Sequence, residues 1–111
     1  MGDAGSLRTL DGRFLYQSKD FPEKPFKLGR SHANLRKYLE SNFQAMDWTY
    51  LIPPPRFLPN GPQTRQYTVM NAEYSFYGEN EFQISYADFA WAVLEEVLHP
   101  EQLNKCVLVT N

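Results

Sequence analysis

The chain has 111 residues, of which 42% are hydrophobic, and a formal net charge of -2 from 11 basic and 13 acidic side chains. This length and composition suffice for one folded domain. The near balance of charge argues against a surface for nucleic acid or anionic lipid, and no stretch approaches the ~20 apolar residues of a membrane span.

Cysteine and histidine usage argues against disulfides and metal sites. Cys106 is the single cysteine and cannot form an intrachain disulfide, and two histidines without a paired-cysteine motif predict no metal site. The first residues lack the charged start and apolar core of a signal peptide. We therefore expect a cytoplasmic protein in which Cys106, at the start of an apolar run, is a buried and inert thiol.

The first 27 residues are expected to form a small hairpin and a loop, with the rest of the domain in residues 28–111. Two short apolar runs between residues 7 and 16 flank Asp11 and Gly12, a pair that suits a tight hairpin turn. Two prolines and scattered charges between residues 18 and 27 favour a loop.

Residues 29–43 are predicted to form an amphipathic helix, with Ser31 as a possible N-cap. Apolar side chains recur there at steps of three and four residues, at Leu35, Tyr38, Leu39 and Phe43. The apolar run that follows at residues 48–52 is stopped by three prolines, which is typical of an interior parallel strand.

Residues 53–64 contain five prolines and are expected to form an extended connection of a functional kind. Short strands are expected at residues 65–70 and 82–84.

A second helix is predicted to begin at Ser85, because Ser85 and Asp88 have the spacing of a capping box. Its nearly unbroken apolar run predicts burial on more than one side, and the proline at position 100 predicts its end. Residues 106–110 are then expected to form a final strand.

Three sequence motifs follow one another along the chain: Gly-Asp-Ala-Gly-Ser-Leu at residues 2–7, Asp-Trp-Thr-Tyr-Leu-Ile-Pro-Pro at residues 47–54, and Ile-Ser-Tyr-Ala-Asp-Phe-Ala at residues 84–90. Together they resemble the atypical short-chain dehydrogenase/reductases of the NADH-flavin reductase-like, NAD(P)H-binding group. The resemblance implies an α/β fold that is the C-terminal part of a doubly wound Rossmann-like sheet, with about two main helices and several short strands. Asp3 and Ile52 depart from the glycine and arginine usual in that family.

Enzymes of this family hold the dinucleotide pyrophosphate on a GxxGxxG-type turn, and no such motif occurs in the sequence. We therefore expect the C-terminal part of a larger NAD(P)H-dependent oxidoreductase that is inactive alone. NAD(P)H would bind only if an N-terminal half is supplied, and no cofactor is expected for the isolated chain. The substrate of the complete enzyme would be a flavin, a quinone or a small carbonyl compound.

The resemblance places Pro53, Pro54 and Phe57 beside the nicotinamide, with Gly5 and Ser6 near the same edge of the sheet. The competing interpretation for the isolated chain is structural: the prolines end a strand, Phe57 fills a gap, and the glycine-rich terminus frays. No catalytic residue is assigned, because the Tyr-x-x-x-Lys pair of the wider superfamily does not occur.

Other polar residues have simpler interpretations. His32 could donate a proton near neutral pH, although a surface histidine is favoured. Asp47 and Asp88 are interpreted as turn and cap residues. Five aromatic side chains could line a site for a planar substrate, belong to the core, or form an exposed patch: Tyr67, Tyr74, Phe76, Tyr77 and Phe82.

The alternative to a reductase is a non-enzymatic interaction or self-associating module. In that case an unpaired sheet edge and an apolar helix face would bind another protein or a second copy, giving a homo-oligomer. The sequence motifs of hydrolases and metalloproteases are absent.

Overall fold

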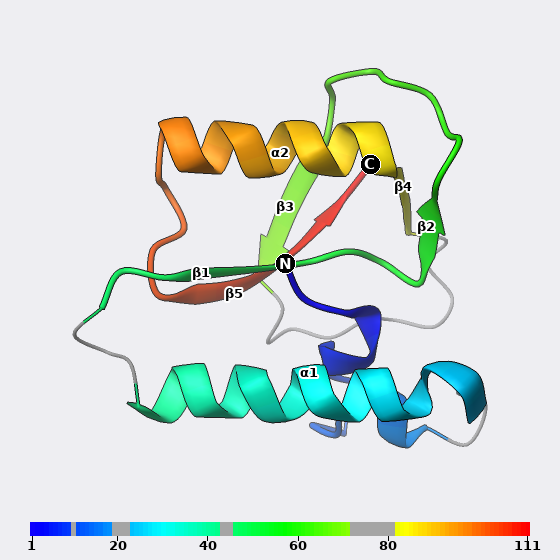
Figure 1. The fold of residues 1–111 in the computed structure, drawn as a ribbon, viewed down its shortest axis with the longest axis vertical. Coiled ribbons are helices and arrows are strands. Elements are labelled where there is room, and N and C mark those ends of the chain that lie inside the picture. The colour runs from blue at the N-terminus through cyan, green and yellow to red at the C-terminus, as the bar shows by residue number, and fades with distance from the viewer. Residues whose placement is uncertain (10, 19–22, 43–45, 72–81) are drawn as a thin grey trace.

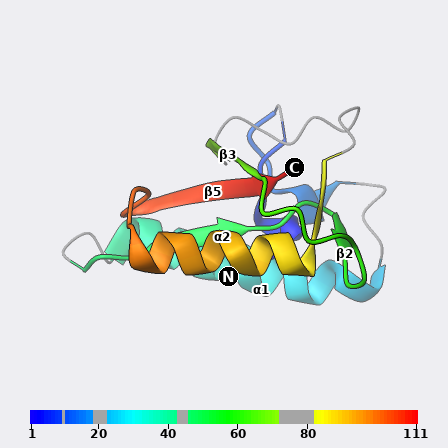
Figure 2. The same ribbon diagram turned by 90° about the horizontal axis from the view of Figure 1, so that it is seen from above.

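A computed structural model describes the chain except for residues 10, 19–22, 43–45 and 72–81. In chain order the elements are the 3-10 turns η1 (Ala4–Ser6) and η2 (Leu15–Gln17), α1 (Glu23–Asn42), β1 (Thr49–Ile52), β2 (Arg56–Leu58), β3 (Thr68–Asn71), β4 (Gln83–Ser85), α2 (Tyr86–Leu98) and β5 (Lys105–Thr110). Figure 1 shows α1 and α2 on opposite sides of β1 and β5, and the view from above in Figure 2 shows α2 lying over α1. The predicted mixed α/β fold is confirmed.

Three strands form a mixed sheet in the order β1-β5-β3. β1 is parallel to β5, with Tyr50 opposite Cys106, and β3 is antiparallel to it, with Val69 opposite Val109. A separate parallel pair joins β2 to β4. The parallel strand predicted at residues 48–52 is therefore present, but among the described strands it lies at an edge, and β5 is the central one.

Alternation along β1 and β5 divides the core into two layers, because successive side chains of a strand point to opposite faces. The layer toward α1 contains Leu7, Tyr50, Ile52, Cys106 and Leu108. The layer toward α2 contains Leu51, Ile84, Phe89, Ala92, Val107 and Val109. The prediction of a buried Cys106 is confirmed.

Residues 8–9 and 11–14 belong to a small hairpin-like turn. Arg8 and Phe14 are joined by a single antiparallel bridge, and Gly12 has a positive φ of 84°. Glycine adopts this conformation without the steric cost of a side chain. The predicted turn is present, although it carries no longer ladder of strand pairs among the described residues.

Helix α1 begins six residues earlier than predicted. It starts at Glu23, so the prediction of a loop through residue 27 is wrong from that point on. Pro25 is compatible with the first turn, because the amide it lacks has no partner within the helix there. Ser31 lies inside the helix and is not its cap.

The buried face of α1 also differs from the prediction. Leu35 and Tyr38 are 45% and 55% exposed, whereas Ala33 and Arg36 are 0% exposed. The cause is tertiary, because Gly29 packs against the 3-10 turn η1 and brings that side of the helix inward. Phe43, the last apolar residue of the predicted pattern, lies outside the described residues.

The connection from residue 53 to residue 64 is less uniform than predicted, because its middle part forms β2 and pairs with β4. The strands expected at residues 65–70 and 82–84 are present as β3 and β4, each shifted toward the C-terminus.

Helix α2 begins where the sequence predicts. The Ser85 hydroxyl oxygen accepts a hydrogen bond from the Asp88 amide at 3.0 Å. The predicted burial on more than one side is wrong, because Leu94, Val97 and Leu98 are exposed. Within the described part of the chain, neither helix is long and apolar enough to cross a membrane.

Candidate functional site

The turn formed by residues 2–7 is ordered against the end of β1, so the prediction that this terminus frays is wrong. The Gly2 amide donates to the Leu51 carbonyl oxygen at 2.6 Å. The Asp3 carboxylate accepts a hydrogen bond from the Gly5 amide at 2.8 Å, and the Ser6 hydroxyl donates to the Asp3 carbonyl oxygen at 2.6 Å. Asp3, which departs from the family pattern, therefore acts as the N-cap of η1.

Gly5 lets this turn touch helix α1. A Cβ atom added to Gly5 would lie 2.5 Å from the Gly29 Cα atom, and one added to Gly29 would lie 2.9 Å from the Tyr16 Cβ atom. Both distances are shorter than carbon contacts allow. The two glycines therefore permit the close packing of η1 on α1, which fixes the turn relative to the sheet.

We expect Gly5→Ala to lower the free energy of unfolding by about 2 kcal/mol, because the added methyl group must displace backbone in a packed layer. Urea denaturation measures this loss. Ser31→Ala, on the exposed side of α1, is the matched control and should change stability by less than about 0.5 kcal/mol. Equal stability of the two variants would contradict the close contact.

Arg36 holds the same turn from the helix. Its side chain is completely buried, and one guanidinium nitrogen donates to the Ser6 carbonyl oxygen at 2.7 Å. The Arg36 Nε atom lies 3.5 Å from the Glu40 carboxylate. Among the residues that the structure describes, the Nη2 atom has no hydrogen-bond partner. The sequence pattern places this arginine on the solvent side, so its role was missed.

Tyr50 of β1 connects the turn with His32 of α1. The Tyr50 hydroxyl lies 2.8 Å from the His32 Nδ1 atom and donates to the His32 carbonyl oxygen at 3.2 Å. Which of the two atoms donates in the bond between the Tyr50 hydroxyl and Nδ1 depends on the tautomer of His32. His32 is half-buried, and its ring lies beside that of Tyr50.

Burial raises the pKa of Tyr50 to about 12, an effect that the nearby Ser6 side chain reduces only in part. The folded chain thus keeps a proton that the unfolded chain releases near the usual tyrosine pKa of about 10. The free energy of unfolding is therefore expected to fall as pH rises from about 10 to about 12. Tyr50 is neutral at physiological pH.

Tyr50→Phe should remove the loss of stability that deprotonation of Tyr50 causes as pH rises from about 10 to about 12. Urea denaturation between pH 9 and pH 12 measures the slope, and Tyr38→Phe, at an exposed position on α1, serves as the control. Parallel slopes in the parent chain and the Tyr50 variant would contradict the assigned pKa shift.

The proline turn lies directly beyond the carboxyl end of β1. Pro53 and Pro54 are both buried. Phe57 of β2 is half-buried, and its ring centroid lies 4.2 Å from that of Tyr86 and 5.2 Å from that of Phe89. Phe57 therefore packs on α2.

The residues predicted to bind the cofactor fall into two groups. Gly5 and Ser6 pack on α1, whereas Phe57 packs on α2, so the two groups lie on opposite sides of β1. Pro53 and Pro54 stand between them in the chain, at the end of that strand.

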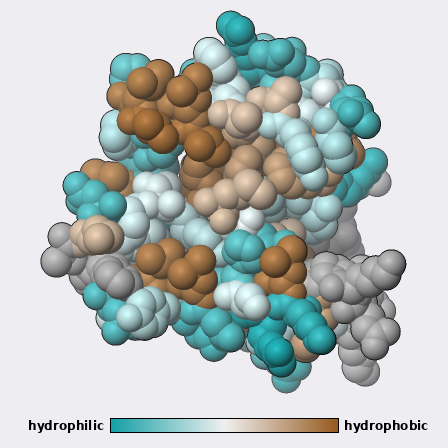
Figure 3. Space-filling view, viewed as in Figure 1, coloured by the Kyte–Doolittle hydropathy of each residue, from teal (hydrophilic) through white to brown (hydrophobic). Residues whose placement is uncertain are grey.

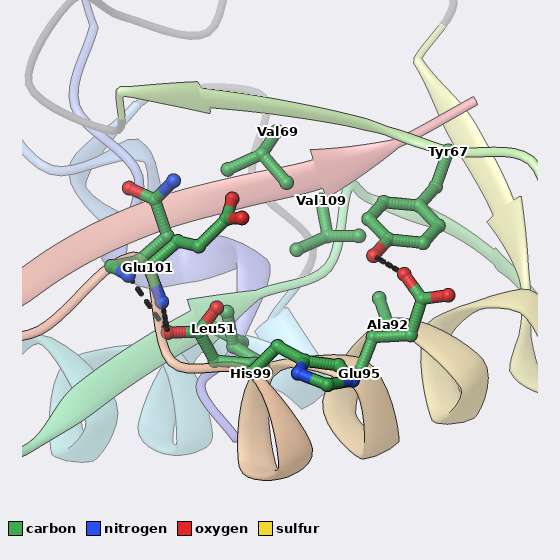
Figure 4. A pocket seen from close by; sticks show the side chains of 10 residues that line it. Leu51, Tyr67, Val69, Ala92, Glu95, His99, Glu101 and Val109 are labelled. Atoms are coloured by element: carbon green, nitrogen blue, oxygen red, sulfur yellow. Dashed lines mark hydrogen bonds between the residues drawn. The ribbon is translucent and has the colours of Figure 1, made fainter.

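A cavity of about 340 Å³ lies between α2 and the sheet. It is lined by Leu51, Tyr67, Val69, Ala92, Glu95, Glu96, His99, Glu101, Gln102 and Val109. In Figure 4, Tyr67 points across the cavity and donates a hydrogen bond to Glu95 of α2. Burial and this bond raise the pKa of Tyr67 to about 12.

The acidic lining of this cavity was not predicted, because glutamates on a surface helix usually face solvent. Glu96 already accepts hydrogen bonds from the Glu101 and Gln102 amides, at 3.0 and 2.8 Å. Among the residues that the structure describes, no group of three or more metal-binding side chains is placed to hold an ion. Of the other predicted aromatics, Phe82 packs on the α1 layer, and Tyr74, Phe76 and Tyr77 lie outside the described residues.

Comparison with known proteins gives no match to any protein-family model. YwnB of Bacillus subtilis (strain 168), an uncharacterized protein, is 31% identical over 107 residues, which are 95% of this chain and 50% of that protein. The crystal structure of SP1627 from Streptococcus pneumoniae TIGR4, a candidate NADH-flavin reductase, matches 100% of this chain and 53% of its own, with a TM-score of 0.86 and 26% identity.

The fold is Rossmann-like. A candidate epimerase from Bacteroides thetaiotaomicron has the same fold, with a TM-score of 0.84 and 24% identity over 98% of this chain and 50% of its own. The chain thus spans about half the length of the proteins that it matches.

Proposed function

We propose that the chain is the C-terminal part of an NAD(P)H-dependent oxidoreductase of the atypical short-chain group, and that it supplies the nicotinamide and substrate side of the cleft. The match to SP1627 carries this proposal, because it extends over the whole chain at 26% identity. The three motifs that suggest the family support it independently. The proposed setting is the cytoplasm, with a flavin, a quinone or a small carbonyl compound as hydride acceptor.

The proposed cofactor contacts are Gly5, Ser6, Pro53, Pro54 and Phe57. Pro53 and Pro54 are buried at the end of β1 and would fix the course of the chain there, while the half-buried aromatic ring of Phe57 offers an uncharged surface that suits a nicotinamide ring. The turn of residues 2–7 would form one side of the nicotinamide site, and Asp3 and Arg36 hold this turn in position. These residues would orient the ring and exclude water, while the bound dinucleotide would supply the hydride.

The sequence offers no recognisable site for the pyrophosphate group of a dinucleotide. The sequence contains no GxxGxxG turn, so it offers no backbone amides in the arrangement that favours a dinucleotide phosphate. We therefore propose that the isolated chain is inactive and binds no nucleotide tightly.

A fluorescence titration with NADH and NADPH tests the proposal on two proteins. One is the 111-residue chain, with its folding checked by circular dichroism. The other is a chimera in which these residues replace the matched half of YwnB. We expect saturable binding by the chimera alone, with a dissociation constant in the micromolar range, equivalent to about 8 kcal/mol.

The variants refine this test. In the chimera, Phe57→Ala should weaken nucleotide binding or slow flavin reduction, whereas Tyr38→Ala on the exposed side of α1 should not. Tight binding by the isolated chain would overturn the incomplete-site proposal, and a folded chimera without binding would overturn the assignment to a reductase.

A second candidate function is a protein-interaction module. The exposed apolar side chains of α2 favour it, because such patches often mark interaction surfaces. Light scattering on the isolated chain tests self-association, and a stable homodimer would support this candidate.

A further inference from the structure

Helix α1 carries a row of positive charges on its exposed side. Lys27, Arg30 and Lys37 follow one another at steps of three and seven residues, with Asn34 between the last two, and all four are exposed. Residues at such steps lie on one face of a helix, and at about 1.5 Å of rise per residue the row is roughly 15 Å long. Figure 3 shows mainly hydrophilic side chains along the lower margin of the molecule, where α1 lies.

The hairpin-like turn beside α1 adds a fourth cation to this row. The Arg8 guanidinium lies 4.4 Å from the Phe14 ring centroid, and the Lys37 ammonium lies 5.7 Å from the same centroid. The Arg30 guanidinium lies 5.8 Å from the Phe26 ring centroid. Because the face of an aromatic ring attracts a cation, the two rings help to hold these side chains in place. The basic row thus consists of four side chains: Arg8, Lys27, Arg30 and Lys37.

Carboxylates close to the basic row have other partners. Asp11 lies 3.6 Å from Arg13, and Glu40 lies 3.5 Å from the buried Arg36. Three glutamates line the cavity under α2, on the opposite side of the sheet. The formal net charge of -2 therefore conceals a separation of charge, because it averages over both sides of the molecule.

The basic row is separate from the exposed apolar side chains of α1. Leu28 and Leu35 are 53% and 45% exposed. Leu35 precedes Lys37 by two residues, which is a rotation of about 200° around a helix. A protein segment that covers the leucines would therefore leave the row accessible. Charged side chains are rarely buried unless they are paired, so the row suits a charged partner and not a core contact.

We propose that the basic row is a docking surface for an acidic, extended segment of another protein. Charge complementarity supports this occupant, because an arginine side chain can donate two parallel hydrogen bonds to one carboxylate and arginine clusters recognise acidic motifs. An extended chain advances about 3.3 Å per residue, so four or five residues would span the row. Phe26, which is 37% exposed beside Arg30, offers an apolar contact for an aliphatic side chain of the segment. The proposal does not depend on the reductase function.

The surroundings of the basic row favour a polypeptide over nucleic acid or lipid. Single-stranded nucleic acid stacks its bases on free aromatic rings. Phe14 is only 5% exposed, and the half-buried Tyr16 ring lies 6.2 Å from the Phe14 centroid and 5.4 Å from that of Phe26. A helix that lies on a membrane presents apolar side chains to it, whereas the exposed Ser31 and Asn34 lie between these cations.

Fluorescence anisotropy tests the proposal with a rhodamine-labelled octapeptide of sequence Glu-Glu-Leu-Glu-Glu-Leu-Glu-Glu. The control probe has glutamine in place of every glutamate. We expect saturable binding of the acidic peptide only, weakened about fivefold when the salt concentration rises from about 50 mM to about 300 mM, because salt screens exposed charges. In NMR spectra, the amide signals of residues 27–37 should shift on addition of the peptide.

Four variants separate the basic row from the net charge. Arg30→Gln and Lys37→Gln should each weaken binding of the acidic peptide about threefold, and the double variant about tenfold, as is typical of exposed ion pairs. Arg56→Gln and Lys105→Gln remove the same charges from exposed positions on β2 and β5 and should leave binding unchanged. Circular dichroism verifies that all variants fold.

Several outcomes would overturn the proposal. One is the absence of binding by the folded chain, and another is an equal loss of binding in the control variants, which would reduce the effect to net charge. Tighter binding to single-stranded oligouridylate or to phosphatidylserine vesicles than to the peptide would assign the row to another class of partner. A dimer of the chain that Arg30→Gln dissociates would make a second copy the occupant.

Discussion

Replacement of Asp88 by alanine is expected to lower the free energy of unfolding by about 3 kcal/mol, because it removes the carboxylate that accepts three hydrogen bonds from Thr64 and Arg65. The Asp88 carboxylate is completely buried. It accepts hydrogen bonds from the Thr64 and Arg65 amides, both at 2.8 Å, and from the Thr64 hydroxyl at 2.7 Å. Urea denaturation measures the loss.

The control is Asp47→Ala, which removes an exposed carboxylate and should change stability by less than about 0.5 kcal/mol. Arg65 provides an internal check. It has a positive φ of 60°, and its guanidinium lies 4.4 Å from the Trp91 ring centroid. Its conformation should relax in the Asp88 variant, because the carboxylate that holds its amide is gone. An Asp88 variant as stable as the parent would exclude this anchoring role.

The Asp88 carboxylate also makes the free energy of unfolding depend on pH in the acidic range. Burial alone would raise the pKa of Asp88, but the hydrogen bonds from Thr64 and Arg65 outweigh it and lower the pKa. A lowered folded-state pKa contributes stability above the unfolded value of about 4 and loses it as the pH falls through the folded value. The Asp88→Ala variant should therefore lose less stability between pH 5 and pH 2 than the parent chain.

Arg36→Ala is expected to lower the free energy of unfolding by about 3 kcal/mol, because it leaves the buried Ser6 carbonyl without a donor and opens a cavity. The residue 2–7 turn should loosen with it. Hydrogen exchange at the Gly5 amide reports this loosening, and chemical denaturation reports the stability.

Two further variants separate charge from volume. Arg36→Met fills most of the space and removes the guanidinium nitrogen that has no hydrogen-bond partner in the described part of the chain, so it should cost less stability than Arg36→Ala. Arg30→Ala, at an exposed position on the same helix, should be nearly neutral. If Arg36→Met proved as damaging as Arg36→Ala, the charged hydrogen bond to Ser6 would be the dominant contribution.

Asp88 and Arg36 have related structural roles on the two sides of the sheet. Asp88 anchors the loop between β2 and β3 to α2, and Arg36 anchors the glycine-rich turn to α1. The glycine-rich turn carries Gly5 and Ser6, so its stability would decide how rigidly the chain presents these two proposed contacts to a nicotinamide ring.

Local sequence patterns were enough to predict the most clearly patterned elements of the fold. The apolar runs that became β1 and β5 are short and rich in residues with high strand propensity, and both are strands. Ser85 begins α2 because a hydroxyl before an apolar run can take a free amide of the first helical turn. The order of three short motifs pointed to the Rossmann-like fold that the structure has.

The sequence by itself thus determined β1, β5, the start of α2 and the fold class, since these depend on neighbours along the chain. Only the tertiary structure decided which face of α1 is buried, that Arg36 supports Ser6, and that Asp88 anchors Thr64. The reason is physical: each of these contacts joins residues more than twenty positions apart, and periodicity describes one element at a time. The close approach of Gly5 and Gly29 overrode the apolar pattern of the helix, because packing space outweighs local preference once two elements touch.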